Sequence, residues 1–117
     1  MSAGTLNITI EQGTTFTRTI AVEDDATNPI DLSDVTEVNG QLRKKYSSSV
    51  AYDFTLSVTD AVNGMISWVM DAEVSASIAV SNASSCSDWV YDIELVRTDN
   101  VERLLEGSAT ISPEVTR

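Results

Sequence analysis

Strict alternation of apolar and polar residues near the C-terminal end is the feature that most restricts how this chain folds. Every second residue from Trp89 to Leu95 is apolar, and the segment from Val101 to Ile111 carries a matching set. Successive side chains of a β-strand point to opposite faces of the sheet, so each segment is typical of a strand with one buried face. The residues Thr98–Asn100 between the two segments favour a turn. The sequence therefore predicts a β-hairpin at the centre of the core.

The length of the loop sets which residues of this hairpin face each other. A two-residue loop would place Ile93 opposite Glu106 and mix the apolar and polar faces, whereas a three-residue loop at Thr98–Asn100 keeps them apart. The three-residue loop predicts four pairs: Ile93 with Leu105, Tyr91 with Gly107, Trp89 with Ala109, and Asp92 with Glu106. The glycine and the alanine leave room for the large rings. The like-charged pair needs solvent or a basic neighbour.

Five earlier segments alternate in the same way and are predicted to be strands. They are Leu6–Ile10, Phe16–Val22, Val38–Leu42, Val50–Val58 and Ile66–Met70. Asp71 is the predicted N-cap of a short helical connection, in which Val74 and Ile78 are one turn apart. Seven strands with turns about every 8–12 residues, and one short helix, describe an all-β, immunoglobulin-like antiparallel β-sandwich. A small barrel is the structural alternative.

Length and composition limit the domain organisation. The 117 residues fit a single domain, 1–117. No apolar run approaches the roughly 20 residues that a membrane span needs, and the first residues lack the pattern of a signal peptide. We therefore expect no membrane contact. Cys86 is the single cysteine, which excludes an internal disulfide and favours a reducing compartment.

Charge restricts the partners and the chemistry. The chain has 18 acidic and 7 basic residues, a net charge of −11, and no His. Phosphate contacts need clustered Lys and Arg, so no nucleic-acid partner is expected. The acidic surface is expected to keep the protein soluble at high local concentration, and the alternative is docking against a basic partner. The absence of His removes the usual general base and the commonest transition-metal ligand.

Acidic residues remain as candidates for catalysis or ion binding. Among 18 acids some pair at the spacing of a glycosidase arises by chance, and nothing in the sequence places one where its pKa would be raised. Asp24-Asp25 and Asp31…Asp34 could supply oxygen ligands to calcium, but their spacing matches no calcium-loop signature, and turn capping is the commoner role. We expect no enzyme activity, no cofactor and no metal.

Several motifs of the chain resemble those of one protein family. They are the N-terminal strand ending in Gln12-Gly13, the turn Pro29-Ile30-Asp31-Leu32, the strand Tyr91-Asp92-Ile93-Glu94-Leu95, and the ending Arg103-Leu104-Leu105-Glu106-Gly107 followed by Ser112-Pro113-Glu114-Val115-Thr116. This pattern resembles small virion structural proteins of tailed bacteriophages and their prophages. Related domains form the N-terminal, baseplate-facing modules of siphophage upper baseplate proteins. Cys86 and the acidic turn at Glu23-Asp24-Asp25 depart from the family pattern.

The resemblance implies a non-enzymatic structural component of a tailed-phage virion, assembled in the host cytoplasm. It implies an immunoglobulin-like tail, baseplate or tail-fibre adaptor module that docks on other phage structural proteins and on copies of itself in a symmetric assembly. A capsid decoration protein is the close alternative. A carbohydrate-binding sandwich is an alternative from another class. That class would expose Trp or Tyr rings, whereas Trp68 and Trp89 fall on predicted inner faces.

Two regions are candidates for contact with neighbouring proteins. The first comprises the terminal segments, which carry no Lys to guard a strand edge and could be covered by an added strand or by packing. Its residues are Leu6, Ile8, Ile10 and Val115. The second is Arg43-Lys44-Lys45, which holds three of the seven basic residues and is a candidate contact for an acidic neighbouring copy. A solvated strand end is the simpler interpretation of the second region.

Overall fold

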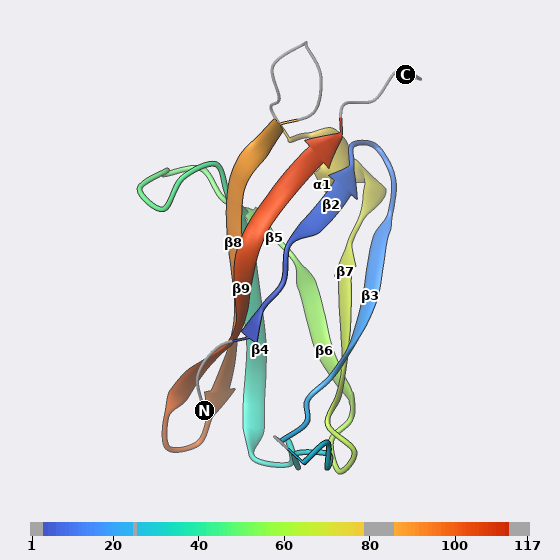
Figure 1. The fold of residues 1–117 in the computed structure, drawn as a ribbon, viewed down its shortest axis with the longest axis vertical. Helices are drawn as coiled ribbons and strands as arrows, with labels where there is room; N and C mark the ends of the chain where they lie inside the picture. Colours follow the sequence, from blue (N-terminus) through green and yellow to red (C-terminus); the bar gives the residue numbers. More distant parts are fainter. Residues whose placement is uncertain (1–3, 25, 79–85, 113–117) are drawn as a thin grey trace.

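Two β-sheets pack face to face in the computed structural model (Figure 1), which describes residues 4–24, 26–78 and 86–112, and for 86–88 the backbone alone. The larger sheet contains β1 (Gly4–Thr5), β2 (Ile8–Glu11), β4 (Val35–Arg43), β5 (Tyr52–Asp53), β8 (Cys86–Arg97) and β9 (Val101–Ser112). The smaller sheet contains β3 (Phe16–Ala21), β6 (Thr55–Asp60) and β7 (Met65–Met70), and the helix α1 (Ala72–Ala76) follows β7. The predicted all-β, immunoglobulin-like sandwich is confirmed.

The strand order places the C-terminal hairpin in the middle of the larger sheet. The order is β1-β9-β8-β4-β5, with β2 also paired to β9, and the smaller sheet has the order β3-β7-β6. Asp71 occupies the predicted N-cap position of α1, although its side chain makes no capping hydrogen bond. Within the described residues, no helix is long and apolar enough to cross a membrane.

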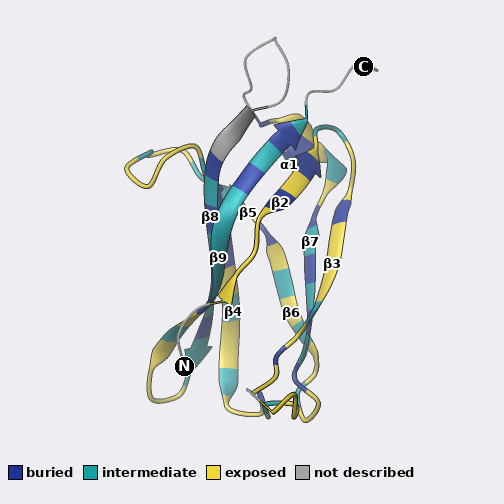
Figure 2. Ribbon diagram, in the orientation of Figure 1, coloured by how far each residue is buried: buried dark blue, intermediate teal, exposed yellow. Residues whose placement is uncertain are grey.

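The core lies between the sheets, where the inward side chains of alternate strand residues meet (Figure 2). Trp68 of β7 is at its centre, with ring centroids of Phe16, Phe54 and Tyr91 at 5.2, 5.3 and 5.4 Å. The contacts with the two phenylalanines are edge-to-face, an arrangement that aromatic pairs prefer. Burial of such rings removes large apolar areas from water, at roughly 25 cal/mol for each Å².

The C-terminal hairpin has the predicted loop at 98–100 and the predicted register over its far part. All four predicted pairs are present: Ile93 with Leu105, Tyr91 with Gly107, Trp89 with Ala109, and Asp92 with Glu106. Nearer the turn, Glu94 pairs with Arg103, so Leu104 is the extra residue of a β-bulge. The predicted inner face is therefore wrong on this side of the bulge. Leu104 is buried, whereas Val101 is 59% exposed.

One predicted strand is divided in two and β1 precedes the predicted strand Leu6–Ile10, so nine strands are described where about seven were expected. Val50–Val58 is not one strand, because β5 pairs with β4 in the larger sheet and β6 pairs with β7 in the smaller one. Phe54, between β5 and β6, is buried in the core. The N-terminal segment is broken between β1 and β2, and both run parallel to β9. The expectation of a wholly antiparallel sandwich is corrected to this extent.

Candidate interaction site

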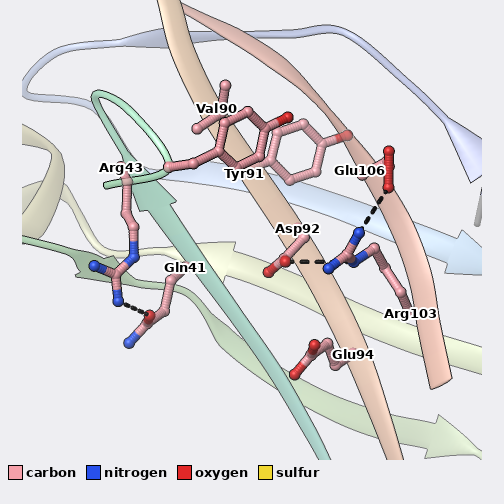
Figure 3. Close-up of a pocket in the computed structure, with 9 residues that line it drawn as sticks. Gln41, Arg43, Val90, Tyr91, Asp92, Glu94, Arg103 and Glu106 are labelled. Carbon is pink, nitrogen blue, oxygen red and sulfur yellow. Dashed lines mark hydrogen bonds and ion pairs between the residues drawn. The ribbon is translucent and has the colours of Figure 1, made fainter. Parts of the chain in front are cut away.

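The outer face of the larger sheet carries a polar hollow of about 270 Å³ between β4, β8 and β9 (Figure 3). Arg103 lies in it, with Nε 3.5 Å from Asp92 Oδ2 and Nη1 3.2 Å from Glu106 Oε1. The bulge turns Arg103 to the face that carries these two acids, so it is the basic neighbour that the like-charged pair requires. The hydrogen bond with Glu106, and then the charge of Asp92, raise the pKa of Arg103.

Arg43 lies at the end of β4 and holds the loop that follows. Its guanidinium donates a hydrogen bond to the Ser48 carbonyl oxygen. It donates a second one, at 3.0 Å, to Gln41 Oε1 (Figure 3). The backbone N–H of Lys45 donates to the Ser48 hydroxyl at 3.1 Å, which closes the same loop. Of the three basic residues selected from the sequence, Arg43 therefore has a structural role in the loop.

The segment Lys44–Val50, here called the basic loop, projects from the larger sheet between β4 and β5 (Figure 1). Lys44 and Lys45 are exposed, and neither ammonium group has a carboxylate within ion-pair distance in the described part of the chain. Tyr46 is 83% exposed and Val50 is 61% exposed. The loop thus combines free positive charge with exposed apolar surface.

A second hollow, of about 420 Å³, borders the basic loop and is here called the loop hollow. It is lined by Lys44, Ser48, Ser49, Val50, Tyr52 and Trp89. The rings of Tyr52 and Trp89, with centroids 6.0 Å apart, form its aromatic part. The indole N–H of Trp89 is buried and has no acceptor among the described residues. The loop hollow therefore joins an aromatic wall to one positive charge and two hydroxyl groups.

The apolar part of this site could not be predicted from alternation. Alternation places Val50 in the predicted strand Val50–Val58, whereas the structure exposes it in the basic loop. The composition around Tyr46 held the available signal, because this aromatic residue stands between two lysines and three serines. A ring in such surroundings has no apolar neighbours in sequence with which to form a buried strand face.

The terminal residues predicted as a contact region have different positions in the structure. The side chains of Ile8 and Ile10 are buried in the chain's own core, whereas Leu6 is 46% exposed. The backbone edge remains available, because β2 pairs with β9 on one side and no described strand pairs with it on the other. Val115 lies outside the described residues. In this region the strand edge, rather than the isoleucine side chains, is the candidate surface.

Both tryptophans lie on inner faces, as predicted. Trp68 is packed among core rings, and Trp89 is 3% exposed. Stacking on a sugar requires an open ring face, and a ring buried to this degree does not present one. The burial of both rings therefore disfavours sugar stacking on Trp68 or Trp89.

The acidic turns that were considered as calcium ligands cap backbone groups. Asp24 Oδ1 accepts hydrogen bonds from the backbone N–H groups of Ala26 at 2.9 Å and Asn28 at 3.0 Å. Asp31 accepts from the hydroxyl and the backbone N–H of Ser33, and these bonds lower the pKa of the Asp31 carboxyl group. Among the residues that the structure describes, no three acidic or cysteine side chains are placed to hold a metal ion.

Comparisons with known proteins give matches among solved structures. No known protein family and no curated protein sequence matches this chain. Among solved structures, the crystal structure of Listeria monocytogenes InlP is similar with a TM-score of 0.40 and 16% sequence identity. The similarity covers 96% of this chain and 28% of that one.

Proposed function

We propose that the chain is a non-enzymatic structural component of a tailed-phage particle, a tail, baseplate or tail-fibre adaptor module that acts by protein–protein docking. The resemblance of its motifs to those of phage virion proteins supports a place in such a particle. The roles of those motif residues support a structural rather than a catalytic use. Arg103 neutralises an acidic pair, Leu104 fills a bulge, and Gly107 is passed closely by the N-terminal segment.

The distribution of exposed side chains is the observation that supports protein–protein docking. Most large apolar side chains are buried between the sheets, whereas Tyr46 and Val50 are exposed together on the loop that also carries both lysines of the chain. Exposed apolar groups ringed by polar ones are typical of surfaces that meet other proteins. The open edge of β2 is a second surface on which a neighbour's strand can pair.

The proposal is tested by looking for the protein in particles. Virions produced by the strain that encodes the chain are purified on a density gradient and analysed by mass spectrometry. We expect the chain to co-purify with known tail components, and particle reconstruction then shows its copy number and position. A position on the capsid surface would instead assign it as a decoration protein. Absence from purified virions would refute both assignments.

The contribution of the β2 edge is tested with a guarding charge. Thr9→Lys adds a lysine to the exposed side of β2, because such a residue commonly prevents strands from pairing at an edge. Thr19→Lys makes the same exchange on β3, which is the edge of the other sheet. We expect Thr9→Lys to lower incorporation into particles while Thr19→Lys and the folding of both variants stay normal. Equal incorporation of the two variants would exclude the β2 edge as a docking surface.

A further inference from the structure

The basic loop carries positive charge that no described residue of this chain neutralises. The only two lysines of the chain are adjacent, at 44 and 45, in a protein with a net charge of −11. The described arginines are occupied: Arg97 pairs with Asp34 and Glu102, and Arg103 pairs with Asp92 and Glu106. Arg43 holds the basic loop, and Arg18 lies 4.7 Å from the centroid of the Phe16 ring. Among the described residues, Lys44 and Lys45 are thus the cations whose charged groups have no hydrogen-bond, ion-pair or aromatic partner.

The loop hollow beside these lysines has a definite chemistry. Its volume falls within the range of roughly 300–1,000 Å³ that binding pockets occupy. Tyr52 and Val50 supply its accessible apolar wall, because Trp89 is only 3% exposed, and Lys44 also lines it. A fitting occupant therefore presents one small apolar side chain with a carboxylate close to it in sequence.

The turn between β8 and β9 presents this combination. Val101 is an exposed aliphatic residue, and Asp99, two residues before it, is exposed and has no hydrogen-bond or ion-pair partner among the described residues. Another exposed valine, Val62, follows Asp60, but both carboxylate oxygens of Asp60 are hydrogen-bonded to Asn63. The β8–β9 turn is therefore the better match to the loop hollow.

The turn and the basic loop lie at different heights of an elongated molecule. The principal extents are 43 × 27 × 24 Å, and Figure 1 shows the turn at the lower end and the basic loop in the upper half, both at the left margin. One copy's turn is too far along the long axis to occupy its own loop hollow. It is placed to reach the hollow of a copy displaced along that axis.

We infer that the loop hollow binds the Asp99–Val101 turn of a second copy of this chain, with Val101 against Tyr52 and Val50 and Asp99 beside Lys44. This inference rests on the proposed assembly function and names the partner. The contact is heterologous, because it uses two different surfaces. After one contact has formed, one copy keeps a free hollow and the other keeps a free turn, so the contact repeats into a ring or a filament. Each contact can be weak because many act together.

The experiment exchanges the two charges in separate copies of the full-length protein. Association is measured by sedimentation equilibrium over a range of protein concentrations at low salt. The wild type is expected to associate reversibly. Lys44→Glu and Asp99→Lys are each expected to weaken association at least about tenfold, because like charges then meet across the contact. An equimolar mixture of the two variants is expected to recover association, because each surface again meets its opposite charge.

Matched controls carry the same charge change elsewhere. Arg18→Glu on β3 controls for Lys44→Glu, and Asp71→Lys before α1 controls for Asp99→Lys. Both controls are expected to associate like the wild type. A monomeric wild type, a mixture that fails to recover, or controls as weak as the test variants would each overturn the inference. Detection in virions is a separate measurement. The chain can therefore be a virion component even if this contact does not form, and the contact can form even if the chain is absent from virions.

Discussion

At Gly107, the lack of a side chain lets the N-terminal segment join the C-terminal hairpin. A Cβ atom at this position would lie 2.0 Å from the Leu6 carbonyl oxygen, a distance that real Cβ atoms do not reach. The same oxygen accepts a hydrogen bond from the Tyr91 hydroxyl at 2.5 Å, and the Leu6 N–H donates to the Glu106 carbonyl at 3.0 Å. Gly107 thus makes space for Leu6 as well as for the Tyr91 ring.

This geometry predicts a specific cost for one methyl group. Gly107→Ala is expected to lower the free energy of unfolding by about 1–3 kcal/mol, because Leu6 must move or the hairpin must distort. Gly4→Ala is the control, since its Cβ would lie an ordinary 3.4 Å from Leu105 Cδ1. Urea unfolding of both variants checks the expectation. A Gly107→Ala midpoint equal to that of the wild type would show that the N-terminal segment does not cross there.

Tyr91 predicts a loss of stability at high pH. Burial raises the pKa of its hydroxyl from 10.0 to about 12. Below the unfolded value both states keep the proton, so the stabilisation is complete; above it only the unfolded state ionises, and stability falls as pH rises toward the folded value. The urea midpoint is therefore expected to drop between about pH 9 and about pH 11.5, and to drop less in Tyr91→Phe. An equal drop in both proteins would contradict this account.

At the scale of elements, alternation predicted strands well and their partners less well. The register around Tyr91 and Gly107 could be predicted because a slip would expose a whole apolar face. The bulge could not, since Leu104 and Leu105 are both apolar and the pattern does not say which one points inward. The break at Phe54 is invisible for a similar reason, because a strand in either sheet points its inward residues at the same core.

The candidate site, like the strands, could be predicted only in part. Charged residues can be recognised directly in the sequence, so the sequence identifies Arg43-Lys44-Lys45 as a candidate contact. The sequence does not reveal the loop hollow, because Trp89 and Val50 are far apart along the chain and meet only when β5 pairs with β4. The parallel pairing of β2 with β9 likewise joins the two ends of the chain, which periodicity alone does not reveal.

The Trp89 ring of the central strand β8 is expected to contribute strongly to the stability of the fold. Trp89→Ala is expected to lower the free energy of unfolding by about 3–5 kcal/mol, because the strand loses a buried ring that faces Ala109 and contacts Tyr52. Circular dichroism is expected to show a β-type spectrum for the wild type and a lower denaturant midpoint for the variant. A midpoint unchanged within error would mean that Trp89 is on the surface, which would restore the carbohydrate-binding alternative.

At the scale of the whole molecule, charge predicts opposite effects of salt on folding and on association. The net charge of −11 makes the acidic groups of one folded copy repel each other, and dissolved ions screen that repulsion. The thermal midpoint of dilute monomer is therefore expected to rise between about 0.05 M and about 0.5 M salt. Salt also screens the repulsion between copies, so the inferred contact between Lys44 and Asp99 is measured as the difference in association between the wild type and Lys44→Glu. The same salt is expected to reduce this charge-dependent part of association. Scanning calorimetry at low protein concentration and sedimentation at high concentration separate the two effects. If the difference between the two proteins stayed equal at both salt concentrations, apolar surface alone would hold the copies together, and the charge pairing at the basic loop would be wrong.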